Sequence, residues 1–594
     1  MSDLFEYPLD TGYLLRKKRA IKKELLQKGI FIHKKVAILG GSTTSEIKDM
    51  LELFLLNEGI RPDFYESSFN KYYEDIMFSD ELKKFSPDII YIHTTYRNIL
   101  NQPEINDNND QIQNKLKKEF DSFKFMWEKA IADHNCLIIQ NNFDYPRNRS
   151  LGNLDTAHIN GFTYFITKLN IMLSEYAQMN TNVLINDINY LSSWVGLEQW
   201  HDLSFWYNFK YALSYHAIPY LAKNISTIVK SAYGKSKKCL VLDLDNTLWG
   251  GVIGDDGVDH IKIGKETAIA EAFSEFQAYI EKLHKQGITL AIASKNDYEN
   301  AIAGLCHPEM VIKQENISNI KANWEPKFSN INKISEELNI GIDSLVFIDD
   351  NPAERDIVKS QLPDVSVPDI GQNVEKFIDF IDRNGYFEPI RISKEDLQRN
   401  HFYELNKKRE EIKSKYKDYG DYLKSLNMIA DINYFKPIYL ERISQLTNKT
   451  NQFNLTTKRY TLTEIEEISK SKNKIPLYGR LKDKFGDNGL ITVVIGDVKG
   501  KELHIDLWLM SCRVLKRDME KAMFDAIVEE CIKKGIERIY GYYYKTQKNN
   551  MVKDHYRNLG FKAVEESDSH GKWIMEVKKA NEKKNSFIAR GEYE

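Results

Sequence analysis

Two aspartates follow an apolar run in the segment VLDLDNTLWGG, at Asp243 and Asp245. The run predicts a buried strand, and open α/β sheets bind their ligands beyond the carboxyl ends of the strands. Ser294 ends a second apolar run, ITLAIAS, where its hydroxyl can donate a hydrogen bond to a phosphoryl oxygen. Lys327, in NWEPKFSNI, can neutralise phosphate charge as a point cation. These residue types indicate phosphate chemistry.

A second acidic pair, Asp349 and Asp350, ends the apolar run LVFIDD. If this run is also a parallel strand, its carboxylates lie at the same sheet edge as Asp243. Carboxylate oxygens are hard ligands of the kind that suits Mg²⁺. The first aspartate pair alone would also fit a solvated strand end followed by a turn, but the further segments favour a site for a metal ion and an anion.

The elements that must position these residues form a repeating pattern. Four apolar runs rich in β-branched residues, VLDLD, ITLAIAS, MVIK and LVFIDD, alternate with helix-like segments. Such alternation predicts a parallel, doubly wound α/β sheet.

The chain has 594 residues, of which 42% are hydrophobic, and this is enough for several packed cores. We predict an α/β multidomain protein with a boundary near residues 234–237 and an α+β last domain. The predicted domains cover residues 1–234, 235–385 and 386–594. Outside the central domain we expect strands at 35–41, 88–93, 136–140, 490–496, 502–509 and 538–544, and helices at 46–56, 394–417, 517–534 and just before Gly560.

Acidic and basic side chains nearly balance at a formal net charge of −3, so no global positive field attracts nucleic acid or an anionic membrane. No stretch reaches the roughly 20 apolar residues of a membrane span, and the N-terminus lacks the apolar core of a signal peptide. The five cysteines show no CxxC spacing, which argues against a disulfide framework and a zinc site. We expect a cytoplasmic protein that binds neither nucleic acid nor membrane.

The ordered set of DxDxT, a serine, a lysine and an acidic pair resembles the motifs of the haloacid dehalogenase superfamily. The resemblance implies that Asp243 attacks phosphorus to form an aspartyl-phosphate, with a carboxylate as the covalent nucleophile. It also implies that Asp245 protonates the leaving group and later activates water. Mg²⁺ would be held by Asp243, the backbone carbonyl of Asp245 and one of Asp349 and Asp350, with Asp350 preferred. Mg²⁺ and Lys327 would cancel the repulsion between an anionic nucleophile and an anionic phosphate.

The stretch between Asp245 and Ser294 contains a flap-like segment, WGGVIGDDGVDHIKIG, and one helix pattern. It is too short for a cap domain. An uncapped site is open to bulky or protein-borne substrates, which points to a carrier protein or another macromolecular partner.

The segments DLDNTLWGGVIGDDG, SKND, IDDNPAER and TNKTNQFNLTTKRYT are similar to those of FkbH-like proteins, from about residue 30 to about residue 580. The resemblance implies an enzyme that takes a phosphorylated three-carbon acid, typically 1,3-bisphosphoglycerate, removes phosphate and loads glyceryl on an acyl carrier protein as a thioester. In the last segment a capped surface turn is the structural alternative to a binding loop. The candidate substrate-binding residues are Thr247, Asn296, Asn451 and Arg459.

One position departs from the FkbH-like pattern. Many members have a cysteine just before the motif serine, suited to holding the acyl group, but this chain has Ala293 there. The alanine favours direct transfer of the acyl group, or simple hydrolysis, over a thioester on the enzyme. Cys239, four residues before Asp243, lies within the predicted strand and is expected in the core.

The segment GGSTTSE after KVAIL resembles the nucleophile block of SGNH hydrolases, which implies Ser42 as a candidate nucleophile. The usual aspartate of that block is Gly41 here. We therefore favour a non-catalytic SGNH-like fold in which the serine caps a helix. Asn141, Asn142 and His201 are the polar residues to inspect.

The C-terminal segments resemble the GNAT acyltransferase fold, in which a glycine-rich turn binds the coenzyme A pyrophosphate through backbone amides. Arg513 matches the first position of that turn, but Lys516 and Asp518 occupy its two glycine positions. We therefore expect a domain that docks a pantetheine arm or an acyl carrier, with Tyr556 at the position of the family's acid.

Three functions remain open at this point. The leading hypothesis is phosphoryl removal from an activated small acid, coupled to acyl transfer to a carrier. The second is a phosphatase that acts on a sugar or glycan phosphate, and the third is a scaffold that binds a biosynthetic partner. The complete set of motif residues argues against the scaffold. The sequence does not determine the oligomeric state.

Overall fold

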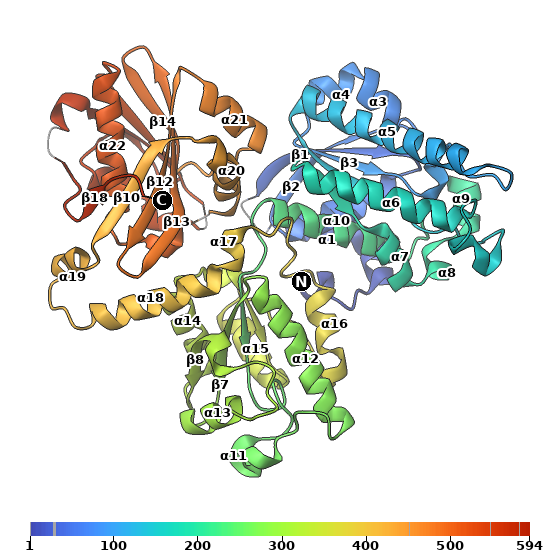
Figure 1. The fold of residues 1–594 in the computed structure, drawn as a ribbon, viewed down its shortest axis with the longest axis horizontal. Helices are drawn as coiled ribbons and strands as arrows, with labels where there is room; N and C mark the ends of the chain where they lie inside the picture. The colour runs from blue at the N-terminus through green and yellow to red at the C-terminus, as the bar shows by residue number, and fades with distance from the viewer. Residues whose placement is uncertain (1, 28–30, 451, 547, 581–582, 594) are drawn as a thin grey trace. The chain divides into compact units, whose positions relative to one another are not determined.

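The computed structural model describes residues 2–27, 31–450, 452–546, 548–580 and 583–593. The candidate Asn451 therefore lies outside the described residues. The chain divides into two compact units, residues 1–231 and 232–594 (Figure 1). Each of its three sheets lies within one predicted domain, and the domain boundary near residue 385 stays a prediction. None of the described helices is long and apolar enough to cross a membrane.

The first unit contains a five-stranded sheet in the order β2-β1-β3-β4-β5, and every neighbouring pair is parallel. One face of the sheet packs against α3, α5 and α6 through a continuous apolar cluster. The bounds are β1 Ile32–Gly40, β2 Ile60–Glu66, β3 Ile89–His93, β4 Leu137–Asn141, β5 Val183–Asn186, α1 Thr11–Leu26, α2 Ser45–Asn57, α3 Tyr72–Phe78, α4 Asp80–Phe85, α5 Asn109–His134, α6 Phe162–Met179, α7 Ile188–Val195, α8 Leu197–Trp200, α9 Leu203–Phe209 and α10 Ile218–Ala232.

The predicted strands at 35–41, 88–93 and 136–140 correspond to β1, β3 and β4, and the predicted helix at 46–56 corresponds to α2. The two outermost strands, β2 and β5, were not predicted. Strand β2 contains Pro62, which sheets tolerate at an edge because proline cannot donate to the ladder. Strand β5 has four residues, too few for a clear alternation of apolar and polar positions.

The second unit begins with a four-stranded parallel sheet in the order β8-β7-β6-β9. Alternate strand residues enter two clusters on opposite faces, one formed with α12, α13 and α16, the other with α14 and α15. This burial on both faces explains why the strands are continuously apolar. The bounds are β6 Cys239–Leu242, β7 Thr289–Ser294, β8 Ile317–Ala322, β9 Leu345–Ile348, α11 Ile253–Asp256, α12 Ala268–Lys285, α13 Tyr298–Leu305, α14 Lys327–Leu338, α15 Pro352–Gln361 and α16 Phe377–Asp382.

The prediction that MVIK forms a strand was wrong. Met310 and Ile312 are buried, but their segment is irregular. The strand between β7 and β9 in the sequence is instead β8, ISNIKA. The side-chain oxygen of Gln277 accepts hydrogen bonds from the amides of Val311 and Ile312 at 2.9 and 3.1 Å. The apolar run is therefore buried without a strand partner because a side chain satisfies its backbone.

The C-terminal sheet is mixed and mostly antiparallel. One face packs against α22, and the other packs against α20 and α21. Strands β13, β14 and β15 and helices α22 and α23 lie where the sequence predicts elements, whereas the remaining strands were not predicted. The bounds are β10 Met428–Tyr434, β11 Phe453–Asn454, β12 Lys474–Asp483, β13 Gly486–Lys499, β14 Glu502–Met510, β15 Arg538–Tyr544, β16 Lys562–Glu566, β17 His570–Glu576, β18 Ile588–Arg590, α19 Tyr419–Ser425, α20 Leu440–Lys449, α21 Leu462–Lys470, α22 Met519–Lys533 and α23 His555–Asn558.

The single charged helix predicted at 394–417 is two helices, α17 Lys394–Leu397 and α18 Arg399–Lys413. The interruption is a turn at Gln398. The Ser393 hydroxyl and the Asp396 amide and carboxylate bond to each other at the start of α17, which caps that helix. The mixed α/β, multidomain class is confirmed.

Candidate phosphoryl-transfer site

The site lies at the carboxyl ends of β6 and β9. Asp243 directly follows β6, and its amide donates to the carbonyl of Ile348 at 3.0 Å, which fixes the end of β6 against β9. Lys327 begins α14, and its ammonium lies 2.8 Å from Asp243 Oδ2 and 2.6 Å from Asp349 Oδ2. All three side chains are buried. The structure thus joins one cation to two carboxylates, as the motif order predicts.

Burial and neighbouring charges shift the pKa values of these groups. Burial lowers the pKa of Lys327, but the carboxylates of Asp243 and Asp349 outweigh it and raise the pKa above its ordinary value. Lys327 is therefore a permanent cation at neutral pH. Burial and the charge of Asp243 raise the pKa of Asp349, and the same two causes raise that of Asp350. The site holds more negative charge than Lys327 balances.

A divalent cation fits this excess of charge. Oxygens of Asp243, Asp349 and Asp350 lie within 4.8 Å of one another. The second oxygen of Asp243, Oδ1, is buried, and no described residue donates a hydrogen bond to it. A buried carboxylate oxygen without a partner is costly, and a hard metal ion would satisfy it. Asp349 Oδ1 already accepts from the Asn351 amide at 2.9 Å, which leaves Asp350 better suited to bind metal directly.

Asp245 is held in place from three sides. Its Oδ1 accepts from the Trp249 indole at 2.9 Å and from the Ile253 amide at 3.1 Å, and its Oδ2 accepts from Asn296 Nδ2 at 3.0 Å. Burial raises the pKa of Asp245, and the charge of Asp243 adds to this. A carboxyl group that keeps its proton to higher pH is suited to general acid catalysis.

Two predicted substrate-binding residues contact the site aspartates instead of an open surface. The Thr247 hydroxyl is fully buried, lies 3.3 Å from Asp350 Oδ1 and accepts from the Asp350 amide at 3.1 Å. Asn296, also buried, donates to Asp245. Ser294 ends β7 at the same sheet edge and is buried. The structure therefore brings the motif residues together, with Thr247 and Asn296 in positioning roles.

Sequence reasoning missed two residues of this site, Trp249 and Arg355. Trp249 holds Asp245, and the Arg355 guanidinium donates to the carbonyls of Asp349 and Asp350, both at 2.8 Å. Arg355 is in turn held by Asp369 at 2.6 Å. Both residues lie within segments that carry the family resemblance, DLDNTLWGG and IDDNPAER, and this was the available signal.

We expect Trp249→Phe to move the alkaline limb of the pH–rate profile to higher pH. The indole hydrogen bond favours the ionised form of Asp245, so its loss raises the pKa of that carboxyl group. Less exact positioning should also lower kcat by about tenfold. The profile is measured with a small phosphate ester at saturating Mg²⁺.

The matched control is Trp573→Phe, because the indole nitrogen of the buried Trp573 has no hydrogen-bond partner among the described residues. Its profile should equal that of the wild type. An unchanged alkaline limb in Trp249→Phe would contradict the acid role of Asp245.

The mouth of the site has no cap domain. Between Asp243 and Ser294, a range that the structure describes completely, the only elements are α11, a short 3₁₀ turn and α12. Large apolar side chains near the site residues are exposed: Trp324 by 70%, Tyr298 by 55% and Val252 by 40%. Trp324 is fixed by a 2.9 Å hydrogen bond from its indole to Asp297. Exposed, oriented aromatic side chains suit contact with a large substrate.

In the first unit, the expectation that Ser42 caps a helix was wrong. The N-cap of α2 is Thr44, and Ser42 is buried with no hydrogen-bond partner for its Oγ among the described residues. Ser42 is therefore not bonded to His201, whose Nε2 lies 3.1 Å from the Tyr145 carbonyl and 3.7 Å from Asp144. No nucleophile–base pair exists here in this conformation.

Asn141 and Asn142 form hydrogen bonds with residues at the ends of the neighbouring strands. Asn141 Nδ2 lies 3.0 Å from His93 Nδ1, and its Oδ1 accepts from Asn186 at 2.7 Å. Asn142 donates to Asp187, the N-cap of α7, at 2.7 Å. Burial lowers the pKa of His93 to about 3, so the imidazole is neutral. These contacts tie the carboxyl ends of β3, β4 and β5 together.

In the C-terminal part, the predicted binding residues are dispersed. Arg459 donates to the carbonyl of Asn448 at the end of α20, and burial lowers its pKa to about 10. Tyr556 is fully buried against Trp508 and Phe561. Arg513 stacks on an aromatic ring and lines a cavity described below.

The segment 513–518 keeps the backbone shape of a glycine-rich turn. Lys516 and Asp518 have φ angles of 64° and 63°, in the left-handed region that favours glycine. Unlike glycine, both residues carry a side chain, and the Asp518 carboxylate forms an ion pair with Lys521 at 2.9 Å. A carboxylate at the start of α22 repels phosphate there.

We expect this domain not to bind acetyl-coenzyme A. Calorimetry should show no heat at micromolar concentrations, because Lys516 and Asp518 carry side chains at the two positions where a phosphate-binding turn has glycine. The paired variant Lys516→Gly with Asp518→Gly serves as the comparison and should gain affinity if the shape of the turn is retained. Micromolar binding of acetyl-coenzyme A by the wild type would contradict this expectation.

The parallel sheet and the cluster of Asp243, Asp245, Lys327, Asp349 and Asp350 define a phosphatase domain of the haloacid dehalogenase type. The family model for the N-terminal domain of FkbH matches residues 35–230. The N-terminal part of the protein BF1531 from Bacteroides fragilis, described as containing a phosphatase domain complexed with Mg, is 32% identical. That match covers 64% of this chain and 99% of that chain, with a TM-score of 0.59. The chain belongs to the FkbH family.

Two N-acetyltransferases are similar to 25% of the chain. One is the ribosomal-protein-S18-alanine N-acetyltransferase from Escherichia coli, 11% identical over 94% of its length with a TM-score of 0.20. The other is the PaiA N-acetyltransferase from Thermoplasma acidophilum in complex with coenzyme A, 16% identical over 98% of its length with a TM-score of 0.18. No curated protein matches the chain.

Proposed function

We propose that this protein is a Mg²⁺-dependent phosphoryl-transfer enzyme with Asp243 as the nucleophile. The observation that carries the proposal is the state of the two Asp243 oxygens. Lys327 binds Oδ2, whereas Oδ1 is buried without a hydrogen-bond partner among the described residues, beside two further carboxylates. This arrangement supports Oδ1 as the metal ligand and Oδ2 as the attacking atom. Oδ2 would be released for attack when the phosphate of the substrate draws Lys327 toward itself.

The reaction follows from these positions. Asp243 bonds to phosphorus while the bond from phosphorus to the leaving oxygen breaks, and the protonated Asp245 gives its proton to that oxygen. Asp245 then takes a proton from water, whose oxygen attacks phosphorus and releases phosphate from Asp243. Asp243, Asp350 and the Asp245 carbonyl would hold Mg²⁺, which would supply positive charge against the phosphate. Lys327 adds a fixed cation.

For the substrate, we propose an activated three-carbon acid, 1,3-bisphosphoglycerate, with the glyceryl group passed to an acyl carrier protein. The membership in the FkbH family and the uncapped mouth with its exposed Trp324 and Tyr298 support a carrier-borne product. In the transfer step the carrier thiol bonds to the acyl carbon, and the acyl–phosphate bond breaks to release phosphate. The site described above would remove the phosphate ester at the other end.

We propose direct transfer, without a thioester on the enzyme at this site. Ala293 is fully buried in the core on the α14 side of β7. Cys239 is also in this core, as expected, and burial raises the pKa of its thiol. Neither position therefore presents a thiolate to substrate.

Mass spectrometry of a candidate acyl carrier incubated with enzyme, Mg²⁺ and freshly generated 1,3-bisphosphoglycerate tests the proposal. A glyceryl mass increment on the carrier supports it. Phosphate release from sugar or glycan phosphates without any increment would favour the second candidate, a plain phosphatase.

We expect Trp324→Ala to separate carrier-borne from small substrates. Trp324 is 70% exposed and lies three residues before Lys327, so it can contact a macromolecule without touching the reacting atoms. KM for a carrier-borne substrate should rise about tenfold, the loss that a modest aromatic contact produces. kcat for a small phosphate ester should not change.

The comparison variant is Tyr416→Ala, an exposed aromatic residue after α18. It should leave both constants unchanged. Equal effects of Trp324→Ala on both substrates would contradict a docking role.

A further inference from the structure

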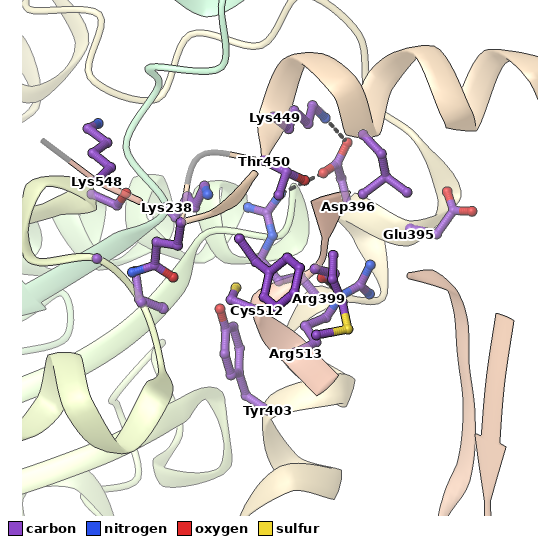
Figure 2. Close-up of a pocket in the computed structure, with 18 of the residues that line it drawn as sticks. Lys238, Glu395, Asp396, Arg399, Tyr403, Lys449, Thr450, Cys512, Arg513 and Lys548 are labelled. Atoms are coloured by element: carbon purple, nitrogen blue, oxygen red, sulfur yellow. Dashed lines mark hydrogen bonds and ion pairs between the residues drawn. The ribbon is translucent and has the colours of Figure 1, made fainter. Parts of the chain in front are cut away.

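A cavity of about 110 Å³ lies in the second unit, at the amino ends of β6 and β9 (Figure 2). The lining comes from the residues before these strands, from helices α17, α18 and α20, from the segment after α20, from the end of β14 and the segment after it, and from Lys548. None of the residues of the proposed catalytic site lines it, whereas Lys449, Thr450, Gln452 and Phe453 belong to the FkbH-like segment TNKTNQFNLTTKRYT. Its charged lining consists of Lys238, Asp343, Glu395, Asp396, Arg399, Arg442, Lys449, Arg513 and Lys548.

Six of these charged side chains are basic and three are acidic. The acidic ones are already paired. Asp396 binds Arg399 at 2.5 Å and Lys449 at 2.7 Å, contacts that Figure 2 marks, and Asp343 binds Lys548. The lining therefore has a surplus of positive charge that its own carboxylates cannot neutralise.

Glu395 lies 3.8 Å from Arg442 Nε and completes the acidic pairs. Two of the six basic side chains in the lining have no acidic partner. Among the residues that the structure describes, Lys238 and Arg513 have no carboxylate within 4.0 Å. Arg513 donates to the Ser511 hydroxyl at 3.2 Å and stacks on an aromatic ring, and both contacts leave its charge uncompensated.

Both side chains are half-buried, and their pKa values are shifted accordingly. Burial lowers the pKa of Lys238, and the charges of Arg399 and Lys548 lower it further. Burial also lowers the pKa of Arg513, with Arg442 adding to the effect. Removing a cation from water without a counterion costs several kcal/mol, so such a cluster favours an external anion.

We propose that this cavity binds a phosphate group through Lys238 and Arg513. The anion would meet a guanidinium, which matches phosphate geometry, and an ammonium, which acts as a point charge. The volume suits a group of this size, since a cavity of about 150 Å³ binds benzene.

This second site is separate from the proposed catalytic site. Asp243 follows β6, whereas Lys238 precedes it, and four residues of strand span roughly 13 Å. The two sites lie at opposite edges of the same sheet. The inference therefore holds or fails independently of the chemistry at Asp243.

Two sources could supply the phosphate group: the phosphopantetheine arm of a carrier protein, or a small phosphorylated acid. Calorimetry on the full chain with EDTA present would use pyrophosphate, 4′-phosphopantetheine, pantetheine, 3-phosphoglycerate and glycerate as probes. We expect binding of the phosphorylated member of at least one pair, with its phosphate-free partner at least tenfold weaker. Which pair shows this difference identifies the source.

The test variants are Lys238→Met and Arg513→Gln, with Lys499→Met and Arg557→Gln, on exposed surfaces, as controls. Each test variant should weaken binding of the phosphorylated probes at least tenfold, and the controls should not. Without phosphate, Lys238→Met should raise Tm by a few degrees because an unpaired, half-buried charge is removed. Wild-type affinity in both test variants, or no phosphate-dependent binding by the wild type, would overturn the proposal.

Discussion

Asp243→Asn should abolish phosphate release, with a fall in kcat of roughly 10⁴-fold or more. The amide has the same shape as the carboxylate but cannot attack phosphorus. Lys327 keeps its second partner, Asp349, at 2.6 Å, so the fold should be retained. Release of phosphate from a small ester and the thermal melting curve are measured together.

The matched control is Asp364→Asn, an exposed aspartate of the same domain. It should retain full activity, which separates a general effect of lost negative charge from the loss of the nucleophile. Substantial turnover by folded Asp243→Asn would exclude the aspartyl-phosphate route.

Chelation of divalent metal should abolish activity, and Mg²⁺ should restore it. Asp243, Asp349 and Asp350 crowd three carboxylates within 4.8 Å against the single charge of Lys327. Mg²⁺ at 100 times its Kd should raise Tm of this unit by about 5 °C, from roughly 2.7 kcal/mol of binding energy. Activity and Tm are compared in EDTA and after Mg²⁺ is added back.

The gain from Mg²⁺ should depend on pH. Burial and the charge of Asp243 raise the pKa of Asp349 to about 6, above the usual value near 4. The metal-free folded state therefore binds protons more tightly than the unfolded chain and loses stability as pH rises from about 4 to about 6. Mg²⁺ binds the ionised carboxylates, so its effect on Tm should be larger at pH 7.5 than at pH 5. An equal effect at both pH values would contradict metal binding by these residues.

Much of the candidate site was predictable from the sequence because its residues are defined by local segments. Asp243 and Asp349 each end a short, continuously apolar strand, and neighbouring parallel strands bring their carboxyl ends to one edge. The α/β class follows from the same alternation of strands and helices. The chemistry was therefore contained in residue type and position along each strand.

Other features depended on contacts between distant segments. MVIK appeared to be a strand, yet Gln277 satisfies its backbone, and Trp249 and Arg355 became site residues only through their hydrogen bonds to Asp245 and to the backbone of Asp349 and Asp350. Local periodicity does not record such partners.

The cationic cavity shows the same limit most clearly. Lys238 and Arg513 lie in different parts of the sequence, and the short basic run that contains Lys238, KSKK, gives no sign of a partnership with Arg513. Local patterns determined the strands and their terminal carboxylates, because the pleat and the helix period act over a few residues. Only the tertiary structure decided which cations lie together without a counterion, because that depends on how the chain closes over long separations.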